Sequence, residues 1–107
     1  VTGRPRSDAV RFLEMHGVQD FFAAVVTLED GPSKPDPEPV LRALDALAVE
    51  RAWMLGDTPD DISAARSAGV LPIGVTAPAD DPGLARKGLE HASRVLRSVN
   101  EIQEILP

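Results

Sequence analysis

The sequence predicts an α/β fold, a three-layer Rossmann-like parallel sheet with helices on both faces. Two observations lead to this fold class. Short apolar runs typical of buried strands recur along the chain, and helical patterns lie between them. Strands that alternate with helices are typical of parallel sheets with crossover connections. With 107 residues the chain is one small domain or part of one.

Four apolar runs are the predicted strands. They are Ala23–Leu28, Ala52–Gly56, Leu71–Thr76 and the short run Arg94–Leu96. Runs of this length bounded by turn or helix signals are typical of strands buried on both faces. Trp53 lies inside the second run, so we expect its side chain in the core.

Helix signals surround these strands. Ser7 is a predicted N-cap for a helix that ends at His16, because Gly17 is a stop signal. A second helix starts near Asp36, since prolines are tolerated in a first turn. The other predicted helices are 59–68, 82–89 and one that follows a capping-box pattern at 98–101.

Composition excludes several classes of function. Eleven basic against seventeen acidic side chains give a net charge of -6, which disfavours nucleic acid as a partner. No apolar run approaches the roughly 18 residues of a membrane span, and no targeting signal is recognisable, so we expect a cytoplasmic protein. Without cysteine, the available metal ligands are carboxylates, hydroxyls and two histidines, a set that suits magnesium.

Acidic residues follow the predicted strand 52–56. Asp57 comes directly after Gly56, and Asp61 lies one helical turn further on. In open parallel sheets ligands bind beyond the carboxyl ends of the strands, so both carboxylates could face a cation there. A purely structural interpretation is also open, because Thr58 and Asp61 have the spacing of a capping box.

Two other segments belong at the same edge of the predicted sheet. Thr2 offers a hydroxyl, and the amide of Gly3 follows it, so together they could bind an anion. Lys34 lies between prolines, and its ammonium could neutralise a phosphoryl group. The alternatives are an ordinary threonine at a strand end and a solvated loop lysine. His16 lies in a predicted helix with no acidic partner nearby in the sequence, and His91 lies in a polar loop, so we expect structural roles for both.

Three stretches, in this order, resemble motifs of a known family. They are "VTGR" at the start, "SKPDPEP" at residues 33–39 and "MLGDTPDDISAARSAGVLPIGV" at residues 54–75. Together they resemble three of the four motifs of the haloacid dehalogenase superfamily of phosphohydrolases, with the nearest similarity to its phosphoglycolate phosphatase-like branch. The resemblance covers nearly the whole chain and is most specific in "GDTPDDI" followed by "AARSAGV".

The resemblance implies a role for each candidate residue. Thr2 and Gly3 would bind the transferring phosphoryl group, and Lys34 would stabilise that group and its attacker. Asp57 would be a direct magnesium ligand, and Asp61 would bind the metal or order its waters. The implied activity is hydrolysis of a phosphate monoester on a small phosphorylated metabolite, through an aspartyl-phosphate and with Mg²⁺ as cofactor. Such roles agree with the needs of phosphoryl transfer.

The family's first motif, an aspartate pair after the first core strand, has no counterpart in the sequence. We therefore expect residues 1–107 to be a single domain that forms the carboxyl-terminal part of a haloacid dehalogenase-like core, incomplete at its N-terminal strand and without the substrate-selecting cap. Alone, the chain would lack the nucleophile and be inactive. A missing core strand also implies self-association or completion of the sheet by another strand.

Two other functions are compatible with the same residues. One is a receiver-like signalling module, which also combines an acidic magnesium pocket, a hydroxyl and a lysine on a doubly wound sheet. In such modules the acidic residues precede the other two, whereas Thr2 and Lys34 precede Asp57 here. The other is a non-catalytic domain that binds magnesium or phosphate. Residue order favours the phosphatase over the receiver.

Overall fold

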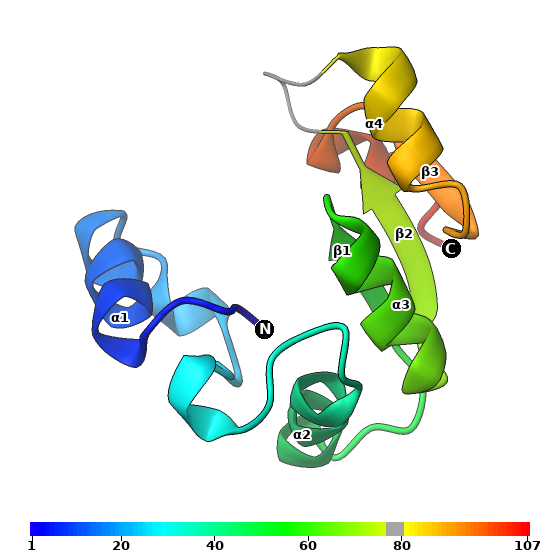
Figure 1. The fold of residues 1–107 in the computed structure, drawn as a ribbon. Coiled ribbons are helices and arrows are strands. Elements are labelled where there is room, and N and C mark those ends of the chain that lie inside the picture. The colour runs from blue at the N-terminus through cyan, green and yellow to red at the C-terminus, as the bar shows by residue number, and fades with distance from the viewer. Residues whose placement is uncertain (77–80) are drawn as a thin grey trace.

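Three parallel strands form one sheet at the centre of the carboxyl-terminal half (Figure 1). The structure, a computed structural model, describes residues 1–76 and 81–107. The strands are β1 (Trp53–Gly56), β2 (Leu71–Val75) and β3 (Arg94–Leu96), and they lie in the order β1-β2-β3. The α/β fold predicted from the sequence is confirmed.

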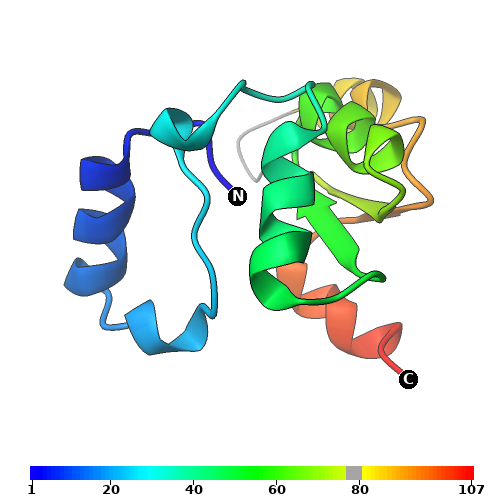
Figure 2. The same cartoon turned by 90° about the horizontal axis from the view of Figure 1, so that it is seen from below.

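Helical crossovers make the parallel pairing possible. Trp53 lies opposite Leu71 in the first pair of strands, and Ile73 lies opposite Arg94 in the second. The helix α3 (Pro59–Ser67) connects β1 to β2, and α4 (Pro82–Gly88) precedes β3. Figure 2 shows α3 and α4 on one side of the strands and the 3₁₀ helix η3 (Val99–Glu104) on the other. Parallel connection brings the carboxyl ends of the strands to one edge of the sheet.

The amino-terminal half lies beside this sheet and is mostly helical. Its elements are α1 (Arg6–Met15), the 3₁₀ helices η1 (Gln19–Phe21) and η2 (Leu28–Asp30), and α2 (Glu38–Leu47). In Figures 1 and 2, α1 lies apart from the three strands, whereas α2 lies beside α3.

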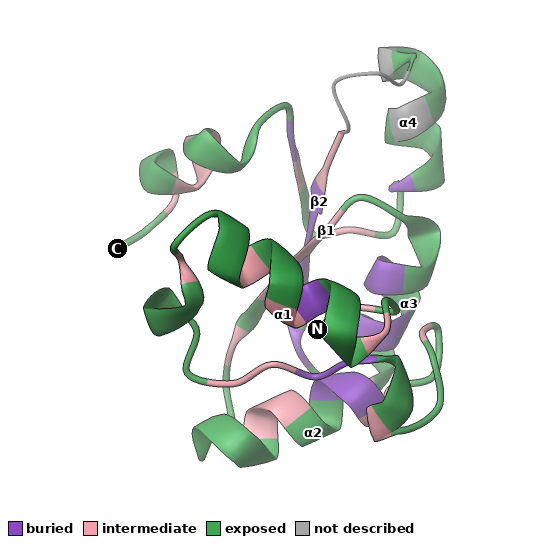
Figure 3. Cartoon of the chain, turned by 90° about the vertical axis from the view of Figure 1, so that its left-hand side faces the viewer, coloured by how far each residue is buried: buried purple, intermediate pink, exposed green. Residues whose placement is uncertain are grey.

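A small core joins α2, α3 and β1. Four buried side chains make it: Val40, Ala64, Ala65 and Val70. Leu44, Ala52, Met54 and Ala68 pack against them. The two alanines are completely buried, so α3 approaches its neighbours closely, as the burial colours of Figure 3 also show for this helix. This packing holds α3 against α2 and β1.

The predicted strand Ala23–Leu28 is wrong. These residues have no ladder, and Leu28 already belongs to η2. Two backbone hydrogen bonds hold the segment beside the start of the chain: the amide of Thr2 donates to the carbonyl of Val26 at 2.9 Å, and that of Leu28 to Arg4 at 3.0 Å. Val26 and Thr27 are buried, which explains the apolar pattern, but two separate bonds do not make a strand.

Three local predictions also fail. Ser7 is not an N-cap, because α1 begins at Arg6 after Pro5 and has no side-chain cap. Trp53 is not a core residue: it is the first residue of β1 and is 39% exposed. The last helix is 3₁₀ rather than α, and its predicted capping box is incomplete because Glu101 accepts from the amide of Arg97.

The other predicted elements are confirmed to within a few residues. They include the helices α2, α3 and α4 and all three strands of the sheet. Among the described residues, no helix is both long enough and apolar enough to cross a membrane.

Candidate active site at the carboxyl end of β1

The turn between β1 and α3 holds the carboxylate of Asp61 inside the protein. Thr58 is the N-cap of α3, and its hydroxyl oxygen accepts from the amide of Asp61 at 3.3 Å. In return, Asp61 Oδ2 accepts from the amides of Asp57 and Thr58, each at 3.1 Å. The capping-box interpretation of this turn is therefore confirmed. Because Asp61 is only 5% exposed, these amides replace the water that its carboxylate loses.

Gly56 makes this arrangement possible. A Cβ atom at position 56 would lie 2.3 Å from Cβ of Asp61 and 2.6 Å from its Cγ and Oδ2. Distances of this kind are far below van der Waals contact, so any larger residue would displace the carboxylate. Glycine is needed at this position because Asp61 approaches the backbone closely, and not because the backbone has an unusual angle.

Lys34 completes the environment of this carboxylate. Its ammonium donates a hydrogen bond to Asp61 Oδ1 and forms an ion pair with it, across 27 positions of sequence. The side chains are 18% and 8% exposed, so the pair is largely shielded from water. Burial alone would raise the pKa of Asp61, but the hydrogen bond and charge of Lys34, with the Thr58 amide, lower it below the usual 3.8. Asp61 is thus held ionised.

Thr2 and Gly3 reach the same region from the start of the chain. Together with Lys34 and Ser33 they line one small cavity. The hydroxyl oxygen of Thr2 accepts from the amide of Arg4 at 3.2 Å, so its own O–H is oriented away from that bond. The structure therefore brings the predicted phosphate-binding residues together around Lys34, while the roles assigned to them stay predictions.

Asp57 lies differently from Asp61. Its backbone amide bonds Asp61, but its own side chain is exposed. Magnesium is commonly bound by one or two carboxylates together with phosphate oxygens and water, so an exposed carboxylate at this edge fits such an ion. Asp61 fits direct ligation less well, because Lys34 and two amides already bind its oxygens. No group of three acidic or histidine side chains suited to a metal occurs among the described residues.

A second polar network, not predicted from the sequence, supports the segment that leads to Lys34. Arg6 pairs with Asp30 Oδ2 at 2.6 Å, and the same oxygen accepts from the amide and the hydroxyl of Thr27 at 2.7 and 3.0 Å. The Thr27 amide and hydroxyl lower the pKa of Asp30, with Arg6 acting in the same direction. The spacing of Thr27 and Asp30 is that of a capping box, which is the signal that could have identified the network.

The two histidines lie away from these candidate residues. The ring of His16 packs on that of Phe12, with ring centroids 4.5 Å apart. His91 is exposed, 3.7 Å from a carboxylate oxygen of Glu90.

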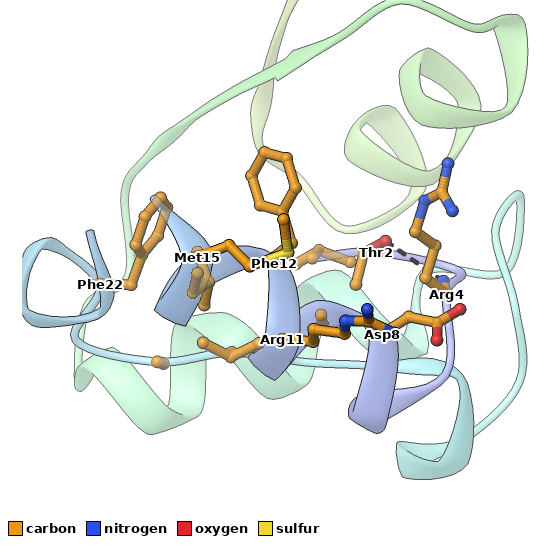
Figure 4. Close-up of a pocket in the computed structure, with 12 residues that line it drawn as sticks. Thr2, Arg4, Asp8, Arg11, Phe12, Met15 and Phe22 are labelled. Carbon is orange, nitrogen blue, oxygen red and sulfur yellow. Dashed lines mark hydrogen bonds between the residues drawn. The ribbon is translucent and has the colours of Figure 1, made fainter. Parts of the chain in front are cut away.

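An apolar cavity of about 560 Å³ opens beside α1. Its lining includes Phe12 and Met15 from α1 and Phe22 from the following segment, all of which are exposed. Figure 4 shows these side chains with Thr2 and Arg4 at the other end of the same cavity. The apolar surface is therefore continuous with the segment that carries the candidate phosphate-binding residues.

Sequence comparison finds relatives for most of the chain. The chain is 55% identical over 80 residues to an imidazoleglycerol-phosphate dehydratase from Phytophthora nicotianae, a match that covers 73% of this chain and 18% of that protein. It is 32% identical to pyrophosphatase PpaX from Halalkalibacterium halodurans, covering 99% of this chain and 50% of the relative. A phosphoglycolate phosphatase from Neisseria gonorrhoeae is also 32% identical, over 99% of this chain and 47% of its own length. The chain spans half or less of each relative.

Solved structures share the fold. A putative haloacid dehalogenase-like hydrolase from Bacteroides fragilis superposes with a TM-score of 0.79 at 28% identity, covering 94% of this chain and 48% of that one. A predicted phosphoglycolate phosphatase from Haemophilus somnus gives 0.78 at 21% identity, covering 98% and 47%. The sequence model of the haloacid dehalogenase-like hydrolase family matches residues 1–75. The match extends over more than half of the chain, which therefore belongs to the haloacid dehalogenase-like hydrolase family.

Proposed function

We propose that this chain supplies the phosphate-binding groups and part of the metal site of a magnesium-dependent phosphate monoester hydrolase. The observation that carries the proposal is the shielded ion pair between Lys34 and Asp61 at the carboxyl end of β1. The pair places one fixed positive charge beside the cavity that Thr2 and Gly3 also line. Fixed positive groups around an oxygen-rich site are the main requirement of phosphoryl transfer.

Each residue has a distinct part in this proposal. Thr2 donates its hydroxyl hydrogen to a phosphoryl oxygen, and the amide of Gly3 donates to another. Lys34 neutralises the charge of the phosphoryl group and of its attacker. Asp61 holds the Lys34 ammonium in place, since their ion pair is largely buried. Positioned charges of this kind need no reorganisation during the reaction.

Asp57 is the proposed protein ligand for magnesium. Its carboxylate is exposed, and its backbone amide donates to Asp61, the residue that anchors Lys34. When bound, the ion would neutralise phosphoryl oxygens. The three donors already bound to Asp61 favour a role for it in ordering the metal's waters over direct ligation.

The nucleophilic aspartate of the proposed mechanism comes from outside residues 1–107. In the complete enzyme it would lie on a strand beside β1, which pairs only with β2 among the described residues. We also propose that the apolar cavity beside α1 is covered by this additional amino-terminal segment. Without such a segment the chain would self-associate through the same surfaces and would not hydrolyse phosphate esters.

A small phosphorylated metabolite is the proposed substrate. The name of one relative, a phosphoglycolate phosphatase, supports this class of compound, whereas the name of another, a pyrophosphatase, supports only phosphate hydrolysis in general. Because the chain covers only 47% and 50% of those relatives, the choice among such substrates belongs to parts of the enzyme outside it.

Calorimetric titration of Mg²⁺ into the chain, with inorganic phosphate present, tests the proposed metal site. Asp57→Asn should weaken Mg²⁺ binding by at least about tenfold, the effect expected for loss of one of at most two protein carboxylates. Asp60→Asn is the matched control, because it removes an equal charge from the next turn at an exposed position. Equal affinity in Asp57→Asn and the unsubstituted chain would reject Asp57 as the ligand. If the complete protein bound Mg²⁺ but hydrolysed no phosphate monoester, the non-catalytic alternative would be favoured.

A further inference from the structure

A second polar cavity lies at the opposite end of the sheet from the candidate active site. It has a volume of about 530 Å³ and is formed where the three strands begin. Its lining includes Arg51, Trp53, Arg66, Leu71, Pro72 and Ser93. Volumes of this size are typical of small-molecule sites. The four residues of β1 separate the two sites by roughly 13 Å along the strand.

Two arginines give this cavity a charge opposite to that of the whole chain. Arg51 precedes β1, and Arg66 lies in the last turn of α3. Neither forms a salt bridge with a described residue, although the chain carries an excess of six negative charges. Arg66 Nε donates to the carbonyl of His91 at 2.5 Å, which fixes the plane of its guanidinium. The remaining guanidinium nitrogens are suited to bidentate binding of an anion.

Carbonyl oxygens at the end of a helix carry partial negative charge and repel anions. At the end of α3 this repulsion is reduced, because amides bind two of these oxygens. The amide of Val70 donates to the carbonyl of Ala65 at 2.9 Å, and that of Gly69 to Arg66 at 3.1 Å. These bonds are those of a helix closed by a left-handed glycine, whose φ is +76° here. Carbonyl oxygens occupied in this way leave the two guanidinium groups as the main charges of the cavity.

An aromatic residue, Trp53, also lines this cavity. Trp53 is 39% exposed, although it belongs to a strand of the sheet, and its opposite residue Leu71 is 43% exposed. A large apolar ring that is left partly uncovered next to arginines can stack against a second flat ring. The cavity therefore combines a stacking surface with two anion-binding groups.

We propose that this cavity binds a mononucleotide, with the base stacked on Trp53 and the phosphate held by Arg51 and Arg66. The combination of a flat ring and a dianionic phosphate matches the two kinds of group that line the cavity. Because it lies at the amino ends of the strands, this site is separate from the phosphoryl-transfer site. Its lining comes from the start of β1, the end of α3, the start of β2 and Ser93, and the proposal does not require the proposed phosphatase activity.

Trp53 provides a direct test, because it is the only tryptophan in the chain. Titration with adenosine monophosphate should quench its fluorescence with a saturable curve. Arg51→Gln should weaken binding at least about tenfold, through loss of a charged hydrogen bond, and Arg66→Gln should do the same. Arg42→Gln, which removes an arginine paired with Glu38 on α2, is the control and should leave binding unchanged.

Two ligand controls separate the base from the phosphate. Adenosine should bind at least about tenfold more weakly than its monophosphate, and inorganic phosphate should not quench Trp53. Urea unfolding of each variant checks that the fold is retained. Absence of saturable quenching in the unsubstituted chain would overturn the proposal, as would equal affinity of Arg51→Gln. If Asp57→Asn still shows the quenching, nucleotide binding does not depend on the proposed metal site.

Discussion

Substitution of Gly56 by alanine tests the geometry of the Asp61 site with one methyl group. The added Cβ would lie 2.3 Å from Cβ of Asp61 and 2.6 Å from Oδ2, in a region where Asp61 is 5% exposed. The carboxylate must move and lose its bonds to Lys34 and to the amides of Asp57 and Thr58. We expect a loss of about 2–5 kcal/mol in the free energy of unfolding, from overpacking and from a poorly satisfied buried charge.

Urea unfolding followed by circular dichroism measures this loss, and Gly88→Ala is the matched control. In the part of the chain that the structure describes, a Cβ at position 88 would meet Pro59 Cγ alone, at 3.6 Å, which is an ordinary contact. Gly88 is the last residue of α4, and alanine there should change the free energy of unfolding by less than about 1 kcal/mol. If Gly56→Ala were as stable as Gly88→Ala, the close packing of Gly56 on Asp61 would be wrong.

Three further changes test the same group of residues. Lys34→Ala leaves Asp61 with its amide partners only; it should lower the free energy of unfolding by about 2–3 kcal/mol, measured in urea, and lower turnover of the complete enzyme at least about tenfold. If the Lys34→Ala variant had unchanged stability and unchanged turnover, Lys34 would be an ordinary solvated loop residue. Thr58→Ala should cost about 1 kcal/mol through loss of the N-cap, whereas Thr58→Ser should cost much less; equal losses would exclude capping as the cause. The lowered pKa of Asp61 means that its contribution to stability is complete above its usual pKa of 3.8 and is lost as pH falls through the folded-state value. Asp61→Asn should therefore flatten the loss of stability as pH falls below the usual pKa of 3.8, and an unchanged pH profile would contradict the lowered pKa.

The position of Asp57 and Asp61 could be predicted because it follows from topology: residues after a buried parallel strand lie at the carboxyl edge of the sheet, and both follow β1. The expected contact of Lys34 with Asp61 rests on the assumption that residues 23–28 form a strand; the contact is present without that strand. The capping box of α3 could be predicted from Thr58 and Asp61 alone, since it depends on residues three apart. The contact of Gly56 with the Asp61 side chain could not, because it depends on the exact approach of β1 to α3.

The wrong or missing predictions concern residues whose secondary structure, exposure or pairing depends on neighbours far away in the sequence. The run Ala23–Leu28 has the composition of a strand and two buried residues, but local composition does not say whether a partner strand lies beside it. Trp53 is apolar and lies in a strand, yet its exposure depends on what covers the beginning of β1. The pair of Arg6 with Asp30 joins residues 24 positions apart, for which the sequence has no periodic signal.

The proposed phosphatase has one direct test, which is reconstitution of activity from two pieces. The chain of 107 residues is assayed with a phosphate monoester and Mg²⁺, alone and mixed with a separately made amino-terminal segment that carries a core strand and an aspartate pair. We expect Mg²⁺-dependent hydrolysis in the mixture only, and its loss when Lys34 is replaced by alanine, because the segment supplies the nucleophile and this chain the phosphate-binding groups. Hydrolysis by the purified chain alone, or a mixture in which Lys34→Ala is as active as the unsubstituted chain, would contradict the proposed division of the active site.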